Sequence, residues 1–157
     1  MTAFNYNELK PNVSLMLEQR GYEFFPGKNR FAEVYLPVDG ESIPPQALPK
    51  ADFAAKQKDT YLFIEVDKDQ GAPHNVAKYF YILDRLRTKP NRVLLLHLLG
   101  SGFLASENNY VFHRKLADFL SKKIKSAFEK QFEFTYNPSE AMDSNEEMLT
   151  WLSKNLP

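Results

Sequence analysis

The sequence predicts one α/β domain over residues 1–157, in which helices flank a mixed β-sheet. The predicted core elements follow the order αβββαβ, with additional helices toward the C-terminus. The length is typical of a single domain with its own apolar core. Short aromatic and β-branched runs alternate with segments whose apolar residues recur at helical spacing. The chain is also 14% aromatic, which supplies core volume.

The N-terminal part is predicted to form a helix followed by strands. Residues 7–20 place their apolar side chains on one side, and Gly21 marks the end of this helix. Residues 22–25 and 30–38 have the composition of strands and are separated by a Pro-Gly turn signal. Because residues 39–49 contain several prolines, we expect a stiff surface loop there.

The middle of the chain is predicted to hold a hairpin followed by a crossover. Residues 51–57 and 61–67 resemble two strands joined by a polar turn. An apolar stripe between Pro73 and Pro90 indicates a helix, and residues 92–99 indicate a buried strand. Since strands joined through a helix need a crossover connection, we expect residues 61–67 and 92–99 to run parallel.

The C-terminal part is predicted to contain two helices separated by a strand. Residues 131–136 indicate the strand, and Ser144 with Glu147 forms a plausible capping box for the last helix. Residues 107–130 are typical of a long amphipathic helix. We expect its inward side to hold Phe112, Leu116, Phe119, Leu120, Ile124, Ala127 and Phe128.

The composition excludes several classes of chemistry and location. The chain has no cysteine, which excludes disulfides, thiolate zinc sites and cysteine nucleophiles. Residues 1–10 lack the apolar run of a signal peptide, and the apolar stretch 93–99 is too short to span a bilayer. We therefore expect a cytoplasmic protein that does not associate with membranes.

Charge is unevenly distributed along the chain although the net charge is zero. Residues 68–130 carry 12 basic and 5 acidic side chains, a net charge of +7, between acidic neighbours. A basic band of this kind favours contact with a polyanion, and the alternative is two ordinary solvated helix faces. The residues expected to contact nucleic-acid phosphates are Arg85, Arg87, Lys115 and Lys122.

Three carboxylates are expected to converge on one face of the predicted hairpin. Side chains alternate across a strand, so Glu65 and Asp67 project from the same face. A symmetric hairpin closure places Asp52 opposite Glu65. Opposed like charges destabilise a sheet unless something neutralises them, and a divalent cation does so well. Hard oxygen ligands indicate Mg²⁺ or Mn²⁺, with the Val66 carbonyl as a further candidate ligand.

These residues resemble the signature of a known nuclease superfamily. Ala51-Asp52, followed on the next strand by Glu65-Val66-Asp67, is similar to the PD-(D/E)xK motif of restriction-endonuclease-like proteins. Ala51 stands in place of the usual proline, and Asp67 in place of the usual lysine. In branches with an E-x-D pattern the lysine lies on the following helix, and Lys78 in the segment 78–81 resembles that arrangement. The resemblance covers about residues 7–99.

The resemblance implies a nuclease with a restriction-endonuclease-like core that hydrolyses phosphodiester bonds in DNA, with RNA as the open alternative. In this interpretation Asp52 and Glu65 hold Mg²⁺ or Mn²⁺, and Asp67 assists the metal or positions water. Lys78 orients or deprotonates the attacking water, with Lys68 as second choice. Glu18 on the first helix matches the position of a further metal ligand, with Glu8 behind it.

Two less specific interpretations stay open at this point. The three acids are also compatible with a solvent-facing hairpin on which they form salt bridges with Lys56 or Lys78. The fold is also compatible with a catalytically inactive module that binds DNA or another protein. His97, in the apolar strand, is expected to be a core side chain. The sequence leaves a homodimer open.

Overall fold

The computed structural model describes the N-terminal helix, the sheet strands, the last helix and parts of the segments between them. The described residues are 5–25, 34–35, 50–67, 77–79, 90–99, 111–112, 115–116, 118–120, 122–123, 131–136, 142 and 144–157. The helices and strands are α1 (Tyr6–Gln19), β1 (Glu23–Phe24), β2 (Val34–Tyr35), β3 (Lys50–Ala51), β4 (Phe53–Gln57), β5 (Thr60–Asp67), β6 (Arg92–Leu99), β7 (Gln131–Tyr136) and α5 (Asn145–Asn155).

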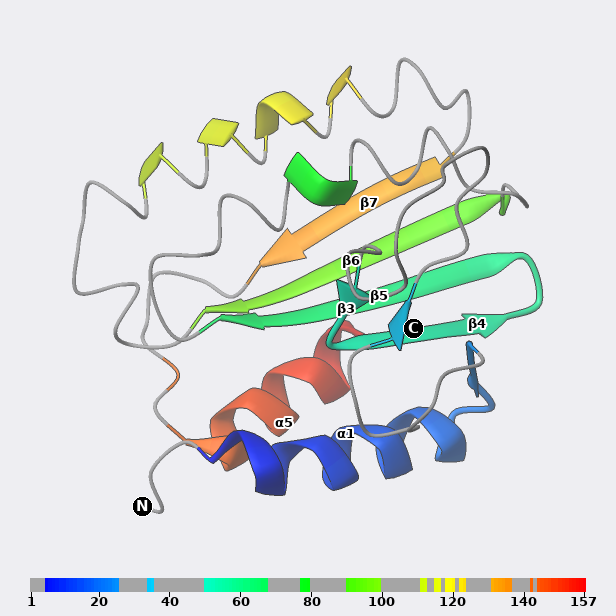
Figure 1. Ribbon diagram of the computed structural model, residues 1–157, viewed down its shortest axis with the longest axis vertical. Helices are drawn as coiled ribbons and strands as arrows, with labels where there is room; N and C mark the ends of the chain where they lie inside the picture. Colours follow the sequence, from blue (N-terminus) through cyan, green and yellow to red (C-terminus); the bar gives the residue numbers. More distant parts are fainter. Residues whose placement is uncertain are drawn as a thin grey trace.

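Five strands form one mixed sheet in the order β1-β4-β5-β6-β7, which confirms the predicted α/β architecture (Figure 1). Strands β1, β4 and β5 pair antiparallel, whereas β5, β6 and β7 pair parallel. The pairing of β5 with β6 confirms the parallel direction that the sequence predicts for these two strands. The short strands β2 and β3 pair separately as a two-stranded ladder, which the sequence did not indicate.

The hairpin of β4 and β5 has the register that the sequence predicts. Phe53 pairs with Ile64 and Gln57 pairs with Thr60, so the chain turns through Lys58 and Asp59. Lys58 adopts a φ of 51°, a left-handed conformation that two-residue hairpin turns of the favoured type require. Continuing the ladder by one pair places position 52 opposite position 65.

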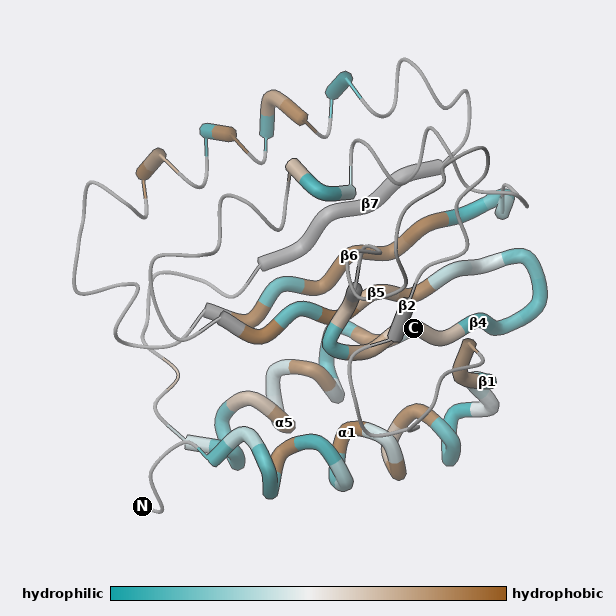
Figure 2. Tube along the Cα trace, in the orientation of Figure 1, coloured by the Kyte–Doolittle hydropathy of each residue, from teal (hydrophilic) through white to brown (hydrophobic). Residues whose placement is uncertain are grey.

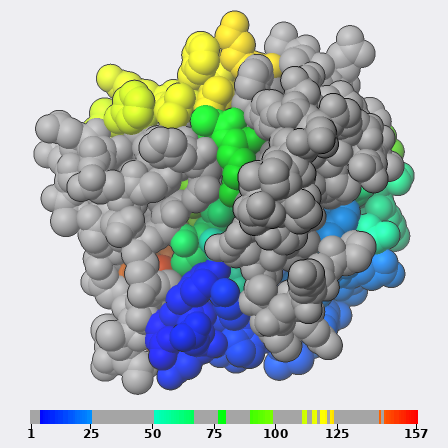
Figure 3. Space-filling view, viewed as in Figure 1, coloured from blue at the N-terminus to red at the C-terminus, as the bar shows by residue number. Residues whose placement is uncertain are grey.

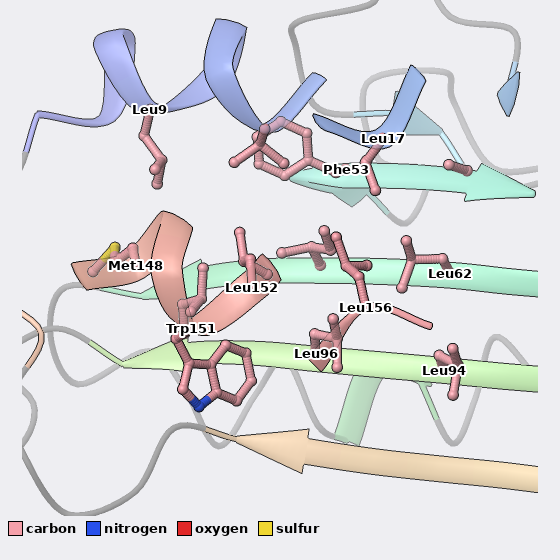
Figure 4. Packing of buried hydrophobic residues seen from close by; sticks show 14 of the residues in the cluster. Leu9, Leu17, Phe53, Leu62, Leu94, Leu96, Met148, Trp151, Leu152 and Leu156 are labelled. Carbon is pink, nitrogen blue, oxygen red and sulfur yellow. The ribbon is translucent and has the colours of Figure 1, made fainter. Parts of the chain in front are cut away.

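Helices α1 and α5 pack side by side on one face of the sheet (Figures 1 and 4). Alternation along the strands directs Leu62, Ile64, Leu94 and Leu96 toward these helices, where they meet side chains such as Leu17. The apolar cluster also includes Met148, Trp151 and Leu152 of α5. Figure 2 shows the corresponding hydropathy pattern, with hydrophobic residues concentrated along the middle of β5 and β6.

The last helix, α5, begins at the predicted capping box. The Ser144 hydroxyl accepts a hydrogen bond from the backbone N–H of Glu147, and the Glu147 carboxylate accepts one from the backbone N–H of Ser144. The guanidinium of Arg20, at the end of α1, donates to the carbonyl oxygens of Ser153 and Leu156, each at 2.7 Å. These bonds tie the C-terminus to the first helix.

The opposite face of the sheet carries the helical residues 77–79 and the described helical residues between 111 and 123 (Figure 1). In the latter segment the inward direction was predicted wrongly for two aromatic side chains. Leu120 is buried, whereas Phe112 is 58% exposed and Phe119 is 55% exposed. At helical spacing both rings lie at the border of the apolar arc, so a modest rotation of the helix about its axis exposes them. Ile124, Ala127 and Phe128 lie outside the described residues.

Within the part of the chain that the structure describes, no helix has both the length and the apolar character needed to cross a membrane. The predicted loop over residues 39–49 lies outside the described residues, as does most of the predicted helix that ends before Pro90. The described residues 77–79 of that helix are helical, as predicted.

Candidate functional site

The predicted acids Asp52 and Glu65 lie close together at the end of the sheet where strand β4 begins and strand β5 ends. Asp52 lies in the bend between β3 and β4. Its Oδ2 accepts a hydrogen bond of 2.7 Å from the backbone N–H of Val66, and its Oδ1 accepts one from the hydroxyl of Tyr6 at the start of α1. These donors, from β5 and from α1, hold the carboxylate of Asp52 beside the end of β5.

Glu65 is a buried carboxylate, with only 3% of its surface exposed. The Lys78 ammonium donates to its Oε1 at 2.7 Å, and the Tyr79 hydroxyl donates to the same oxygen. Within the described part of the chain, no hydrogen bond reaches the second oxygen, Oε2. Both of these donors therefore contact the same carboxylate oxygen, Oε1.

The electrostatics of Glu65 reflect a charge that is only partly compensated. Burial raises its pKa to about 7, the Lys78 ammonium lowers it, and the neighbouring Asp52 carboxylate raises it further. Two carboxylates thus interact in a site that excludes most water. At neutral pH Glu65 is poised between its protonated and ionised forms, so that an additional cation would favour the ionised form.

Tyr79 reaches Glu65 because aromatic packing holds its ring against the sheet. The ring is fully buried, and its centroid lies 5.1 Å from that of Phe63, the neighbour of Glu65 two positions back on β5. Phe63 in turn stacks on Phe25 and meets Tyr61 edge to face. The sequence indicated Tyr79 only as part of an apolar helical stripe, because hydropathy spacing does not report what a hydroxyl at the end of a buried ring will meet.

Lys78 and Tyr79 are neighbours in one helical turn, yet both reach the same carboxylate oxygen. Tyr79 approaches from the buried side, while the Lys78 side chain keeps 22% of its surface exposed. The structure therefore brings the predicted Lys78 together with Glu65. The alternative interpretation is wrong in placing Glu65 toward solvent, because this side chain is buried, but the salt bridge with Lys78 that it included is present. Lys56 instead forms a long ion pair of 3.7 Å with the exposed Glu23.

His97 is a further polar residue beside the acids, and its place was not predicted. It is buried, as the sequence analysis expected, but β6 pairs it in register with Glu65. Parallel neighbours in register project from the same face of a sheet, so the imidazole and the carboxylate occupy adjacent positions on that face. A histidine between leucines gave no sign of this, because the parallel register depends on the fold.

The predicted ligand Glu18 lies away from this arrangement. Glu18 is exposed on the last turns of α1, about 18 Å along the helix axis from Tyr6, which contacts Asp52. The end of α1 lies instead near Gln57, whose amide donates to the carbonyl of Arg20. The structure thus does not support Glu18 as a ligand. The more N-terminal Glu8 is also exposed.

Several predicted residues lie wholly or partly outside the described part of the chain. This is the case for Lys68, Arg85 and Arg87, and for the side chain of Asp67, although its backbone continues β5. Lys115 and Lys122 are described and exposed. Their exposure is compatible with the predicted phosphate contacts.

The donor set is compatible with a divalent cation held by Asp52 and Glu65. Among the described residues no group of three or more histidine, aspartate or glutamate side chains is placed to hold a metal ion. The two carboxylates alone offer hard oxygen ligands, and cations such as Mg²⁺ commonly bind to one or two carboxylates and otherwise to water and substrate phosphates. Two features of Glu65 fit such an ion: its Oε2 accepts no hydrogen bond from the described residues, and its pKa is raised.

Chemically, the arrangement combines two carboxylates, one ammonium group and two tyrosine hydroxyls at one edge of the sheet.

We compared the chain with known proteins at the level of family, sequence and structure. No protein-family model, no curated protein and no solved structure matches this chain.

Proposed function

We propose that the chain is a metal-dependent nuclease with a restriction-endonuclease-like core, which hydrolyses phosphodiester bonds in DNA or RNA. The order α1, β1, β4, β5, helical residues 77–79 and β6 supports the αβββαβ core. The observation that carries the proposal is the contact of Lys78 with a buried Glu65 beside Asp52. An acid, a second acid and a lysine meet at the end of a hairpin, which is the arrangement that the PD-(D/E)xK resemblance implies.

The proposed roles follow from the position of each group. Asp52 and Glu65 hold Mg²⁺ or Mn²⁺, which when bound would favour formation of hydroxide from water and stabilise negative charge on the phosphate. Lys78 is half-buried, so its ammonium contacts Glu65 while remaining near solvent. As the ammonium it orients the attacking water, and only as the neutral amine, after losing a proton, would it accept one from that water. Tyr6 and Tyr79 orient the two carboxylates through their hydroxyl groups.

A second candidate is a catalytically inactive module of the same fold. The observation that favours it is the Glu65–Lys78 ion pair itself, which already compensates part of the buried charge. In such a module the pair would be a structural element, and a divalent cation would have no site. The two candidates therefore differ in whether the folded chain binds a metal.

Metal binding and cleavage together test the proposal. We expect millimolar Mn²⁺ or Mg²⁺ to raise the thermal midpoint, because a ligand that binds only the folded state stabilises it. Single- and double-stranded DNA and RNA are then incubated with the protein and Mn²⁺. We expect Asp52→Asn to abolish both the midpoint shift and cleavage.

Lys78→Met separates catalysis from metal binding. We expect it to lower the cleavage rate by about 100-fold or more, the scale of a lost general acid-base group, while the midpoint still rises with Mn²⁺. Lys56→Met is the matched control, because this lysine pairs with an exposed glutamate away from the site, and its cleavage rate should not change. Absence of any metal-dependent midpoint shift, or cleavage that survives Asp52→Asn, would exclude this site as a nuclease centre.

A further inference from the structure

Exposed aromatic and basic residues occur together among the described helical residues between 111 and 123. Phe112 and Phe119 are more than half exposed, and Val111 is 42% exposed. Lys115, Lys122 and Lys123 are exposed as well. Among the described residues of this segment the only acidic side chain is Asp118, so the surface has an excess of positive charge. We call Phe112, Lys115, Phe119, Lys122 and Lys123 the Phe-Lys surface.

The Phe-Lys surface has a regular spacing. Phe112 with Lys115 and Phe119 with Lys122 are two copies of the same pair, separated by seven residues. In a helix, seven residues make about two turns and advance about 10.5 Å, so both copies face the same direction. The exposures agree with this geometry, since Leu116 is half-buried and Leu120, further around the helix from the rings, is buried. The surface thus presents two rings, each beside a lysine.

The chemistry of this surface fits single-stranded nucleic acid. Exposed aromatic rings stack on unpaired bases, and lysines contact the phosphates of the same strand. The Lys123 ammonium already lies 5.7 Å from the centre of the Phe119 ring, which shows that cation and ring occupy one site. A duplex hides the faces of its bases, so its phosphates could use the lysines but not the rings. Positive charge of this density also disfavours a purely apolar protein partner.

The surface lies on the same side of the sheet as Lys78. In Figure 1 the described helical residues between 111 and 123 and the helical residues 77–79 lie on the other side of the sheet from α1 and α5. In the space-filling view their atoms emerge on one face of the molecule (Figure 3, yellow and green). A strand bound on the rings would therefore lie on the same side of the sheet as the segment that carries Lys78.

We propose that the Phe-Lys surface binds single-stranded nucleic acid by stacking bases on Phe112 and Phe119 and pairing phosphates with the three lysines. This inference rests on the proposed nuclease function and specifies its substrate as an unpaired strand. The two rings provide the preference for single strands, whereas the lysines provide affinity that depends on salt.

The test measures binding without cleavage. Fluorescence anisotropy with a labelled single-stranded DNA or RNA oligomer, and with the corresponding duplex, is recorded in EDTA. We expect the wild-type protein to prefer the single strand. Phe112→Ala with Phe119→Ala should weaken single-strand binding by about tenfold or more and leave duplex binding nearly unchanged. Replacing the three lysines with alanine should weaken both and reduce the salt dependence.

Leu15→Ala is the matched control, because Leu15 is an exposed apolar residue of α1 on the other side of the sheet. It should bind both oligomers as the wild type does. Circular dichroism checks that the double variant is folded. We expect it to fold because both replaced rings are exposed and the core is unchanged. Wild-type protein that binds no single strand, or a double variant that binds it unchanged, overturns the proposal. So does a wild-type dimer that the double variant abolishes while single-strand binding is retained, because the surface would then be a contact between copies.

Binding in EDTA and cleavage in Mn²⁺ together distinguish a failure of the proposed surface from a failure of the proposed nuclease function. Binding in EDTA that depends on the two rings, with no cleavage in Mn²⁺, would refute the nuclease and support the surface. Cleavage that depends on Asp52 but not on Phe112 and Phe119 would refute the surface and support the nuclease.

Discussion

The two faces of the sheet differ in what a single strand contributes to each. On the side of α1 and α5, Leu62 and Ile64 of β5 enter an apolar cluster. On the other side the same strand presents Phe63 and Glu65, whose partners are Tyr79 and Lys78. Burying a carboxylate is unfavourable without hydrogen bonds and a counter-charge. The first face therefore stabilises the fold through apolar burial. On the second face, burial of a carboxylate lowers stability but keeps this group away from water.

The largest expected loss of stability is on the α1 and α5 face. Leu152→Ala removes a fully buried side chain from the apolar cluster and should lower the free energy of unfolding by about 2–5 kcal/mol. Urea denaturation measures the change, with Leu15→Ala as the exposed control. An equally small effect of both changes would mean that this face is not the main source of stability.

The Glu65 carboxylate on the second face should make the free energy of unfolding depend on pH. The pKa of Glu65 is about 7 in the fold and near 4.5 when it is exposed. Between these values the folded protein holds a proton that the unfolded chain has released, so the free energy of unfolding falls as pH rises from 4.5 to 7. The expected total fall from this group is about 3 kcal/mol, complete above the folded pKa.

Glu65→Gln should remove this part of the pH dependence, so that the variant gains stability relative to wild type as pH rises toward 8. Urea denaturation at several pH values between 4.5 and 8 measures the difference. Glu23→Gln is the control, because the Glu23 carboxylate is exposed and pairs only distantly with Lys56. A slope that Glu65→Gln leaves unchanged would show that this carboxylate is not buried as described.

The smallest of these effects concerns a single hydroxyl group. Tyr79→Phe keeps the ring against Phe63 but removes the donor to Glu65, so the pKa of Glu65 should rise further. At pH 8 we expect a loss of about 2 kcal/mol in the free energy of unfolding, typical of a hydrogen bond to a charged group, and a smaller loss at pH 5. Tyr61→Phe, on the same face, is the control, since among the described residues none forms a hydrogen bond with its hydroxyl. Equal losses at both pH values would contradict the assigned role of Tyr79.

Local features of the sequence determined much of the fold. The hairpin register that opposes positions 52 and 65, the strand over residues 92–99 and the capping box of α5 were all predicted. Each depends on spacing within a short segment: alternation in a strand, a two-residue turn, or a side chain that reaches three residues along a helix. The predicted pairing of Asp52 and Glu65 and the predicted proximity of Lys78 followed from these local rules and from the resemblance.

The other features of the site and of the exposed surface depend on the tertiary structure. The hydroxyls of Tyr6 and Tyr79 reach the two carboxylates, and His97 lies beside Glu65, because the fold brings separate segments to one edge of the sheet. Glu18 is far from that edge for the same reason, since the sequence does not say which end of the helix lies beside Asp52 and which lies beside the hairpin turn. The exposure of Phe112 and Phe119 depends on how far their helix rotates about its own axis. Periodicity defines the width of an apolar arc, but contacts with the rest of the molecule select its centre.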